Sequence, residues 1–242
     1  EICACLVGSE MCIRDRSSSI QKDMSVAAAR GRIYDRNGVL LAYNDLSYAV
    51  KISDSGRYSD NATKNTTINN SINKTLDIIE NHGDTYSNDF PIIYNNGQFS
   101  YNVEGTSLLR FLRDSYGTES IAALSDEQKA TSAENMFKYL CKTYEVNYDE
   151  FGIEHSLMIV NLRRYMAANS YNRYLTFIIA NEVSDETVAA ILENSDGLVG
   201  VTVEEQYIRR YVDSVYCSQI LGYTGTVSNS ELEELGDGYE SN

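Results

Sequence analysis

The feature that most constrains the fold is a tight chain reversal at Asn37-Gly38, which lies between two short apolar runs. Residues 32–34 precede the turn and residues 39–43 follow it. An Asn-Gly pair readily adopts the positive backbone torsions that a two-stranded reversal needs. The sequence therefore predicts a strand, a turn and a second strand here, with residues 47–52 as a third short strand.

A polar stretch comes next, and a helical pattern follows it. Residues 53–67 contain Ser, Asp, Asn, Thr and Gly with almost no apolar residue, which predicts a loop. Thr67 is the expected N-cap of the helix, and Gly83 follows its last turn. The apolar residues recur at helical spacing: Ile68, Ile72, Leu76 and Ile79.

The middle of the chain reads as one hairpin followed by helices. Two short apolar runs, 92–94 and 99–101, flank a turn that contains Asn96-Gly97. Capping patterns and apolar stripes then predict helices at 107–116, after Ser125 with Gln128 as a capping box, after Ser132, and at 156–168. The stripe of the third helix, which includes Cys141, indicates core packing.

The last third returns to strands. Residues 174–180 read as a buried strand, and Ser184 caps a helix whose Val188, Ile191 and Leu192 are expected to face the core. Val199, Val201 and Val203 alternate with polar residues or Gly, as in a strand with one wet face. Ser228 with Glu231 predicts a final capped helix. Separated strands and helices without an internal repeat predict an α+β fold.

The net charge disfavours two classes of partner. The chain has 20 basic and 35 acidic residues, a formal charge of -15, which disfavours binding to nucleic acid or anionic lipid. The longest apolar runs, 174–180 and 157–162, are too short to span a membrane.

The start of the chain differs from the rest. Residues 1–16 lack an amphipathic period, and their apolar stretch is too short for a signal peptide, so we expect a non-native tail. Their cysteines, Cys3, Cys5 and Cys12, lack the spacing and fourth ligand of a metal site. The five cysteines of the chain are too unevenly placed to predict a disulfide framework.

Three blocks of the chain, in order, carry a more specific pattern. Residues 30–42 read RGRIYDRNGVLLA and resemble RGxIxDRNGxxLA, the opening motif of class B penicillin-binding proteins. A second block covers residues 183–189, 198–204 and 209–211, and a third covers 220–225, followed by an acidic helix. The motif positions singled out by the resemblance are Arg30, Gly31, Asp35, Arg36, Asn37, Gly38, Glu204, Arg210, Tyr211, Gly222 and Gly225. The chain departs from the family at residues 212–214, where the family usually has proline and a nearby glycine.

The resemblance implies an elongated α+β pedestal of antiparallel strands with an inserted α/β head subdomain. It implies a pedestal start at 17–53, a head at 54–172 and a return segment at 173–242 that ends near the junction to a transpeptidase domain missing from this chain. The parent would be a peptidoglycan D,D-transpeptidase on the extracytoplasmic face of the bacterial membrane, held by an upstream helix that this chain lacks. Expected partners are that transpeptidase domain, cell wall synthesis proteins such as a glycosyltransferase, and a second copy in a homodimer. The alternative is a free-standing extracytoplasmic interaction module without any transpeptidase domain.

We expect no catalysis by this chain. The family's catalytic domain carries SxxK, SxN and KTG or KSG, because an acylated serine needs a nearby base and an oxyanion site. Two SxxK strings, Ser19 to Lys22 and Ser71 to Lys74, and SxN strings such as 59–61 and 170–172 match at the frequency expected by chance, and no KTG or KSG occurs. His82 and His155 have no catalytic partner at motif spacing. No cofactor is expected.

Two interpretations of the motif residues stay open. Arg30, Arg32 and Arg36 could form ion pairs with Glu204 and Glu205. In that hypothesis Asp35 and Arg36 are structural clamps; in the other, the motif residues satisfy a turn and nothing more. The 19 tyrosines of the chain suit either interface anchors in the head or half-buried core positions.

Overall fold

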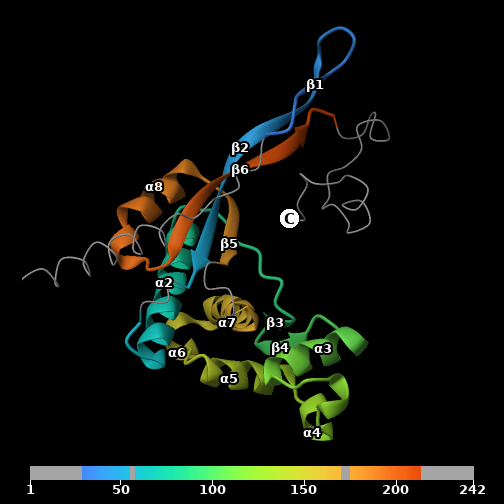
Figure 1. Ribbon diagram of the computed structural model, residues 1–242, viewed down its shortest axis with the longest axis vertical. Coiled ribbons are helices and arrows are strands. Elements are labelled where there is room, and N and C mark those ends of the chain that lie inside the picture. Colours follow the sequence, from blue (N-terminus) through green and yellow to red (C-terminus); the bar gives the residue numbers. More distant parts are fainter. Residues whose placement is uncertain (1–28, 55–57, 170–174, 214–242) are drawn as a thin grey trace, which may run out of the picture. The chain divides into compact units, whose positions relative to one another are not determined.

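The computed structural model describes residues 29–54, 58–169 and 175–213 (Figure 1). The chain divides into two compact units, one formed by residues 45–208 and the other by the residues before and after that range. The described residues contain both helices and antiparallel strands, which confirms the predicted α+β class. The division at residues 53/54 and 172/173 stays a prediction.

The smaller unit contains the predicted reversal. β1 (Ile33–Tyr34) pairs antiparallel with the start of β2 (Leu40–Ser53), with Ile33 opposite Ala42 and Tyr34 opposite Leu40. Gly38 in the turn has a φ of 83°, a torsion that a residue without Cβ adopts at little cost.

The prediction of separate strands at 39–43 and 47–52 is wrong, because β2 runs without a break through both. Its polar middle, from Asn44 to Ser47, looked like a connection in the sequence. It stays extended because β2 pairs with β1 near its start, with β5 near its end, and also with β6.

The other two strands of the sheet are β5 (Thr176–Val183), which lies in the larger unit, and β6 (Val201–Tyr211), most of which does. β5 is antiparallel to β2, with Val50 opposite Ala180. β6 begins beside Gly200, whose carbonyl oxygen accepts a hydrogen bond from the Ser53 amide at 2.9 Å. A Cβ on Gly200 would lie 2.3 Å from the Ser53 carbonyl oxygen, so this close approach requires glycine.

Helices and one hairpin make up the remainder of the larger unit. The hairpin, β3 (Ile92–Asn95) and β4 (Gln98–Tyr101), has the predicted turn and packs against α5 and α7 (Figure 1). The α-helices of the described residues are α2 (Asn61–Asn81), α3 (Gly105–Tyr116), α4 (Asp126–Lys129), α5 (Ala133–Thr143), α6 (Tyr148–Phe151), α7 (Ile153–Ala168) and α8 (Asp185–Glu193). Short 3-10 turns cover Ile121–Ala123 and Ser195–Gly197.

The predicted start of α2 at Thr67 is wrong by two turns. The helix begins at Asn61, and the Asp60 side chain caps it by accepting a hydrogen bond from the Thr63 amide at 2.7 Å. The first turns of α2 are polar and mostly exposed, so they carry no apolar period that a sequence pattern could detect. The apolar stripe from Ile68 to Ile79 is fully buried, as predicted.

The other helix signals are largely confirmed. Ser125 and Gln128 form the predicted capping box, and Ser132 and Ser184 cap α5 and α8. Leu192 was expected in the core but is 60% exposed, because α8 turns only Ile191 fully inward at its end. The helix predicted after Ser228 lies outside the described residues.

Candidate functional site

The opening block forms a turn organised by one carboxylate. Asp35 Oδ1 accepts hydrogen bonds from the backbone amides of Asn37 at 2.8 Å and Val39 at 2.7 Å. The Gly38 amide closes the turn by donating to the Asp35 carbonyl oxygen at 3.1 Å. A short acidic side chain that satisfies amides two and four residues ahead fixes a reversal without help from the protein core. Asp35, Asn37 and Gly38 therefore form one locally stabilised turn.

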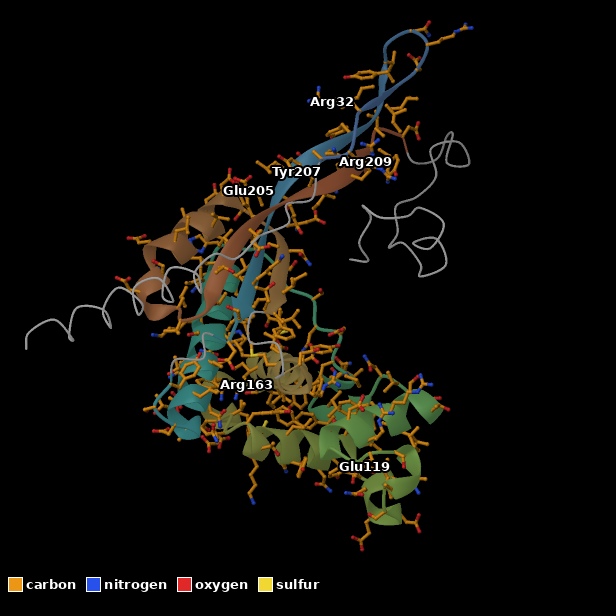
Figure 2. All side chains as sticks on the ribbon, viewed as in Figure 1. Arg32, Glu119, Arg163, Glu205, Tyr207 and Arg209 are labelled. Carbon is orange, nitrogen blue, oxygen red and sulfur yellow. The ribbon has the colours of Figure 1, made fainter. Side chains whose placement is uncertain are left out.

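The second block reaches the opening block through Arg209. The Arg209 Nη1 atom donates to the carbonyl oxygen of Gly31 at 2.7 Å and to Asn44 Oδ1 at 3.1 Å. Figure 2 labels Arg209 near the end of β6 and Arg32, which directly precedes β1. The Val212 amide also donates to the carbonyl oxygen of Leu41. Residues far apart in the sequence thus meet in the smaller unit around one guanidinium group.

The structure does not show the ion pair that was expected between Glu204 and the arginines of the opening block. Glu204 pairs with Lys51, with Lys51 Nζ 2.5 Å from Glu204 Oε2, and not with an arginine of the opening block. Arg36 is exposed and makes no hydrogen bond or ion pair with any residue that the structure describes. The hydrogen bonds of Asp35 described above all lie within its own turn, and the clamp role of Asp35 and Arg36 stays a prediction.

The remaining motif residues are placed as follows. Arg30 and Gly31 lie on the exposed segment before β1, and Arg210 and Tyr211 end β6. Gly222 and Gly225 fall outside the described residues. The sequence pattern identified the blocks but not Arg209 as their contact, because a hydrogen bond to a backbone carbonyl leaves no signal in the residue types.

The one SxxK string that the structure describes is not arranged for acyl transfer. Ser71 lies on α2, is 1% exposed, and its carbonyl oxygen accepts a hydrogen bond from the Thr75 hydroxyl. Lys74 instead borders a cavity of about 450 Å³, whose lining includes Asp77, Glu193 and Asp196. A serine that no substrate can reach has no route to a carbonyl carbon. In the first SxN string, Asp60 serves as the helix cap.

The other candidate nucleophile and bases have structural contacts. Burial raises the pKa of the Cys141 thiol to about 12, which keeps it protonated and unreactive at neutral pH. His82 ends α2, with its Nδ1 atom 2.8 Å from the Ile78 carbonyl oxygen. The His155 ring lies between Asn73 and Glu80, at 2.8 Å and 3.1 Å, and so joins α7 to α2.

The described residues hold neither a cluster of metal ligands nor a membrane-spanning helix. Within residues 29–54, 58–169 and 175–213, no group of three or more His, Cys, Asp or Glu side chains is placed to hold a metal ion. In the same ranges no helix is both long and apolar enough to cross a membrane.

A partly buried hydrogen-bond cluster ties the segment just after α2 to the start of α8. Asp84 Oδ2 accepts from the Ser184 amide at 2.8 Å, the Ser184 hydroxyl at 2.7 Å and the Thr187 hydroxyl at 2.5 Å. Burial alone would raise the pKa of Asp84, but the hydrogen bonds from Thr187 and Ser184 outweigh it and hold the pKa below its usual value. Asp84 therefore adds to the cap of α8 that Ser184 provides, although it lies 100 positions earlier in the chain.

Comparison with known proteins adds a family match. A family model described as the penicillin-binding protein dimerisation domain matches residues 25–242. No curated protein matches the chain. Among solved structures, penicillin-binding protein 2B from Streptococcus pneumoniae strain 5204 is 19% identical, with a TM-score of 0.44 over 90% of this chain and 32% of that chain. The same protein from strain R6 is 19% identical, with a TM-score of 0.41 over 90% and 31%. The chain thus spans about a third of the length of these two structures.

Proposed function

The chain belongs to the penicillin-binding protein dimerisation domain family, and from that membership we propose that it is the noncatalytic N-terminal module of a class B penicillin-binding protein. In this role it positions a peptidoglycan transpeptidase domain of the same polypeptide and binds proteins of cell wall synthesis. The module works on the extracytoplasmic face of the membrane, where an upstream helix anchors it.

The match over residues 25–242 is the observation that carries the proposal. Two features of the molecule support it. Arg209 connects the opening and late blocks of the resemblance, as a scaffold would need. Ser71, the serine of the described SxxK string, is buried, and Cys141 is held as an unreactive thiol.

Sequencing of the native DNA across both ends of the chain tests the positioning role. We expect an upstream span of about 20 apolar residues, and downstream SxxK, SxN and KTG-like motifs in one reading frame. A stop codon directly after Asn242 would contradict that role and favour the free-standing interaction module.

Photo-crosslinking in the native cells tests partner binding. A crosslinking amino acid at Tyr139, which is 40% exposed on α5, is expected to trap a cell wall glycosyltransferase that mass spectrometry identifies. The matched control is Phe137 on the same helix, which is 1% exposed and should give no crosslink to another protein. Equal product from both positions would argue against a specific partner.

A further inference from the structure

β5 leaves one edge without a strand partner in the part of the chain that the structure describes. Within residues 29–54, 58–169 and 175–213, β2 is the only strand that pairs with β5. An unpaired edge exposes backbone N–H and C=O groups that an extended segment of another protein can bind. β5 and every residue that lines the cavity beside it belong to the larger unit.

The pairing of β2 identifies the backbone groups that face this edge. The Ser53 amide donates to the residue that precedes β6, so the backbone groups of the neighbouring residue in β2, Ile52, face β5. Ile52 lies opposite Phe177, and the register is regular from Thr176 to Ile178. Because backbone groups alternate between the two edges of a strand, the N–H and C=O groups of Thr176 and Ile178 face the unpaired edge.

A cavity of about 430 Å³ lies between β5 and α7. Ligand pockets in proteins typically have volumes of about 300–1,000 Å³, so this one has room for side chains of a bound segment. A third wall comes from the segment that follows α2, which passes from the side of β5 to β3 (Figure 1). Ile178 is 48% exposed, which leaves its side chain within reach of a ligand. The apolar lining residues are Met158, Leu162 and Tyr165 of α7 with Phe177, Ile178 and Ile179 of β5.

One carboxylate is held at the wall of this cavity. Asp89 Oδ1 accepts a hydrogen bond from Asn161 Nδ2 at 2.7 Å, and Asp89 Oδ2 accepts one from the Tyr165 hydroxyl at 3.0 Å. Asn161 is buried, so packing fixes its amide, whereas Asp89 itself is exposed. Both donors are neutral, and Arg164 contacts Asn161 and the Tyr165 ring instead of Asp89. None of the described residues that line the cavity is lysine, arginine or histidine.

We propose that an extended segment of a partner protein binds beside β5 as an added strand, with apolar side chains in the cavity and a lysine or arginine against Asp89. This inference rests on the proposed function and deepens it by naming the surface and the chemistry of the partner segment. Hydrogen bonds to the backbone of Thr176 and Ile178 provide affinity, and the cavity and Asp89 select the side chains of the segment.

The charges of the chain favour a basic occupant. The chain carries a formal charge of -15, and the cavity has a carboxylate but no cation among its described lining residues. A positively charged segment is attracted to such a surface, and an acidic segment is repelled by it. One added strand is a small interface, so the complex should dissociate readily.

Peptide selection on the full chain tests the chemistry of the occupant. Random linear peptides displayed on phage are selected on the immobilised chain, and the enriched peptides are titrated by fluorescence anisotropy. We expect the enriched peptides to combine apolar residues with lysine or arginine. In Asp89→Asn, which is nearly isosteric, the Kd should rise about fivefold, as expected for one charge pair across strands. The matched control, Glu119→Gln, removes the same charge from an exposed residue that does not line the cavity, and should bind the peptides as the wild type does (Figure 2).

Ile178→Pro tests strand addition, because it removes a backbone N–H on the unpaired edge. We expect it to abolish peptide binding with an unchanged circular dichroism spectrum; if the proline unfolds the chain, Asp89→Asn still decides the test. Equal Kd values in the Asp89 and Glu119 variants would overturn the inference. Enrichment of no peptide, of acidic peptides or of peptides that match this chain itself would also overturn it, the last by assigning the cavity to a second copy. These results would leave the proposed function standing, since crosslinking at Tyr139 measures partner binding on a different helix.

Discussion

Arg209 donates a hydrogen bond of 2.7 Å to the carbonyl oxygen of Gly31, which lies 178 positions earlier in the chain. The same Nη1 atom reaches Asn44, so one guanidinium group joins the segment before β1, strand β2 and the end of β6. The opening block is otherwise held by the local turn at Asp35 and by pairing of β1 with β2.

Removal of this guanidinium should loosen the opening block. We expect Arg209→Ala to increase amide hydrogen exchange of residues 31–44 about fivefold, which corresponds to about 1 kcal/mol, a typical net value for a hydrogen bond. Mass spectrometry of the exchanged peptides measures the effect. Arg32→Ala is the matched control, because Arg32 is an exposed arginine of the same unit. Equal exchange in both variants would contradict the role of Arg209.

Substitutions at Asp35 and Arg36 distinguish the clamp hypothesis from the interpretation in which these residues only stabilise a turn. Asp35→Ala leaves the amides of Asn37 and Val39 without their acceptor, and we expect a loss of about 1 kcal/mol in the free energy of unfolding. Arg36→Ala should change the melting temperature less, because the side chain is exposed. An unchanged melting temperature in Arg36→Ala would end the clamp hypothesis for that residue.

Some of this arrangement could be predicted from the sequence and some could not. The turn at Asn37-Gly38 and the caps at Ser125, Ser132 and Ser184 are local, so residue types a few positions apart determine them. The contact of Arg209 with Gly31 depends on the pairing of β2 with β6, which no local pattern encodes.

The errors have the same origin. β2 was divided in two because its polar middle resembles a loop until the neighbouring strands are known. The first turns of α2 were missed because a polar, exposed helix has no apolar period, although Asp60 supplies an ordinary cap signal. The predicted fold class is still correct, since it depends on the order of the helices and strands and not on their exact bounds.

The Asp84 cluster predicts a specific loss of stability in acid. The folded-state pKa of Asp84 lies below its usual value, so its contribution is present above about pH 4 and is lost as pH falls through the folded-state pKa. Asp84→Asn keeps the shape but removes the charge that accepts bonds from Ser184 and Thr187. Urea unfolding should show the variant about 1 kcal/mol less stable at pH 7, with a smaller difference near pH 3. A difference that does not change with pH would rule out a role for the carboxylate charge.

The buried side chain of Arg163 should contribute to the free energy of unfolding more through packing than through its charge. Arg163 lies on α7 (Figure 2), is 6% exposed, hydrogen bonds Asn65 and stacks 5.7 Å from the ring centre of Tyr144. Burial lowers the pKa of Arg163, and none of the carboxylates that the structure describes is within ion-pair distance of it. We therefore expect Arg163→Met to change the free energy of unfolding by less than about 1.5 kcal/mol.

Arg163→Ala is the comparison that isolates packing. It leaves a cavity between α2 and α7, and a loss of about 3 kcal/mol is expected by analogy with other large-to-small core substitutions. Chemical denaturation of the three proteins measures both values. Equal losses in the Met and Ala variants would mean that the charge and its hydrogen bond, and not the volume of the side chain, stabilise this site.

The chain should form no covalent adduct with penicillin. Acylation needs a serine hydroxyl that the β-lactam carbonyl can approach, a base beside it and donors for the oxyanion. Ser71 is 1% exposed inside a helix, so it fails the first requirement although Lys74 follows at the SxxK spacing. Intact mass spectrometry after incubation with excess penicillin should return the unmodified mass. A stoichiometric adduct that disappears in Ser71→Ala or Ser19→Ala would locate a catalytic serine in this chain and would contradict its assignment as a noncatalytic module.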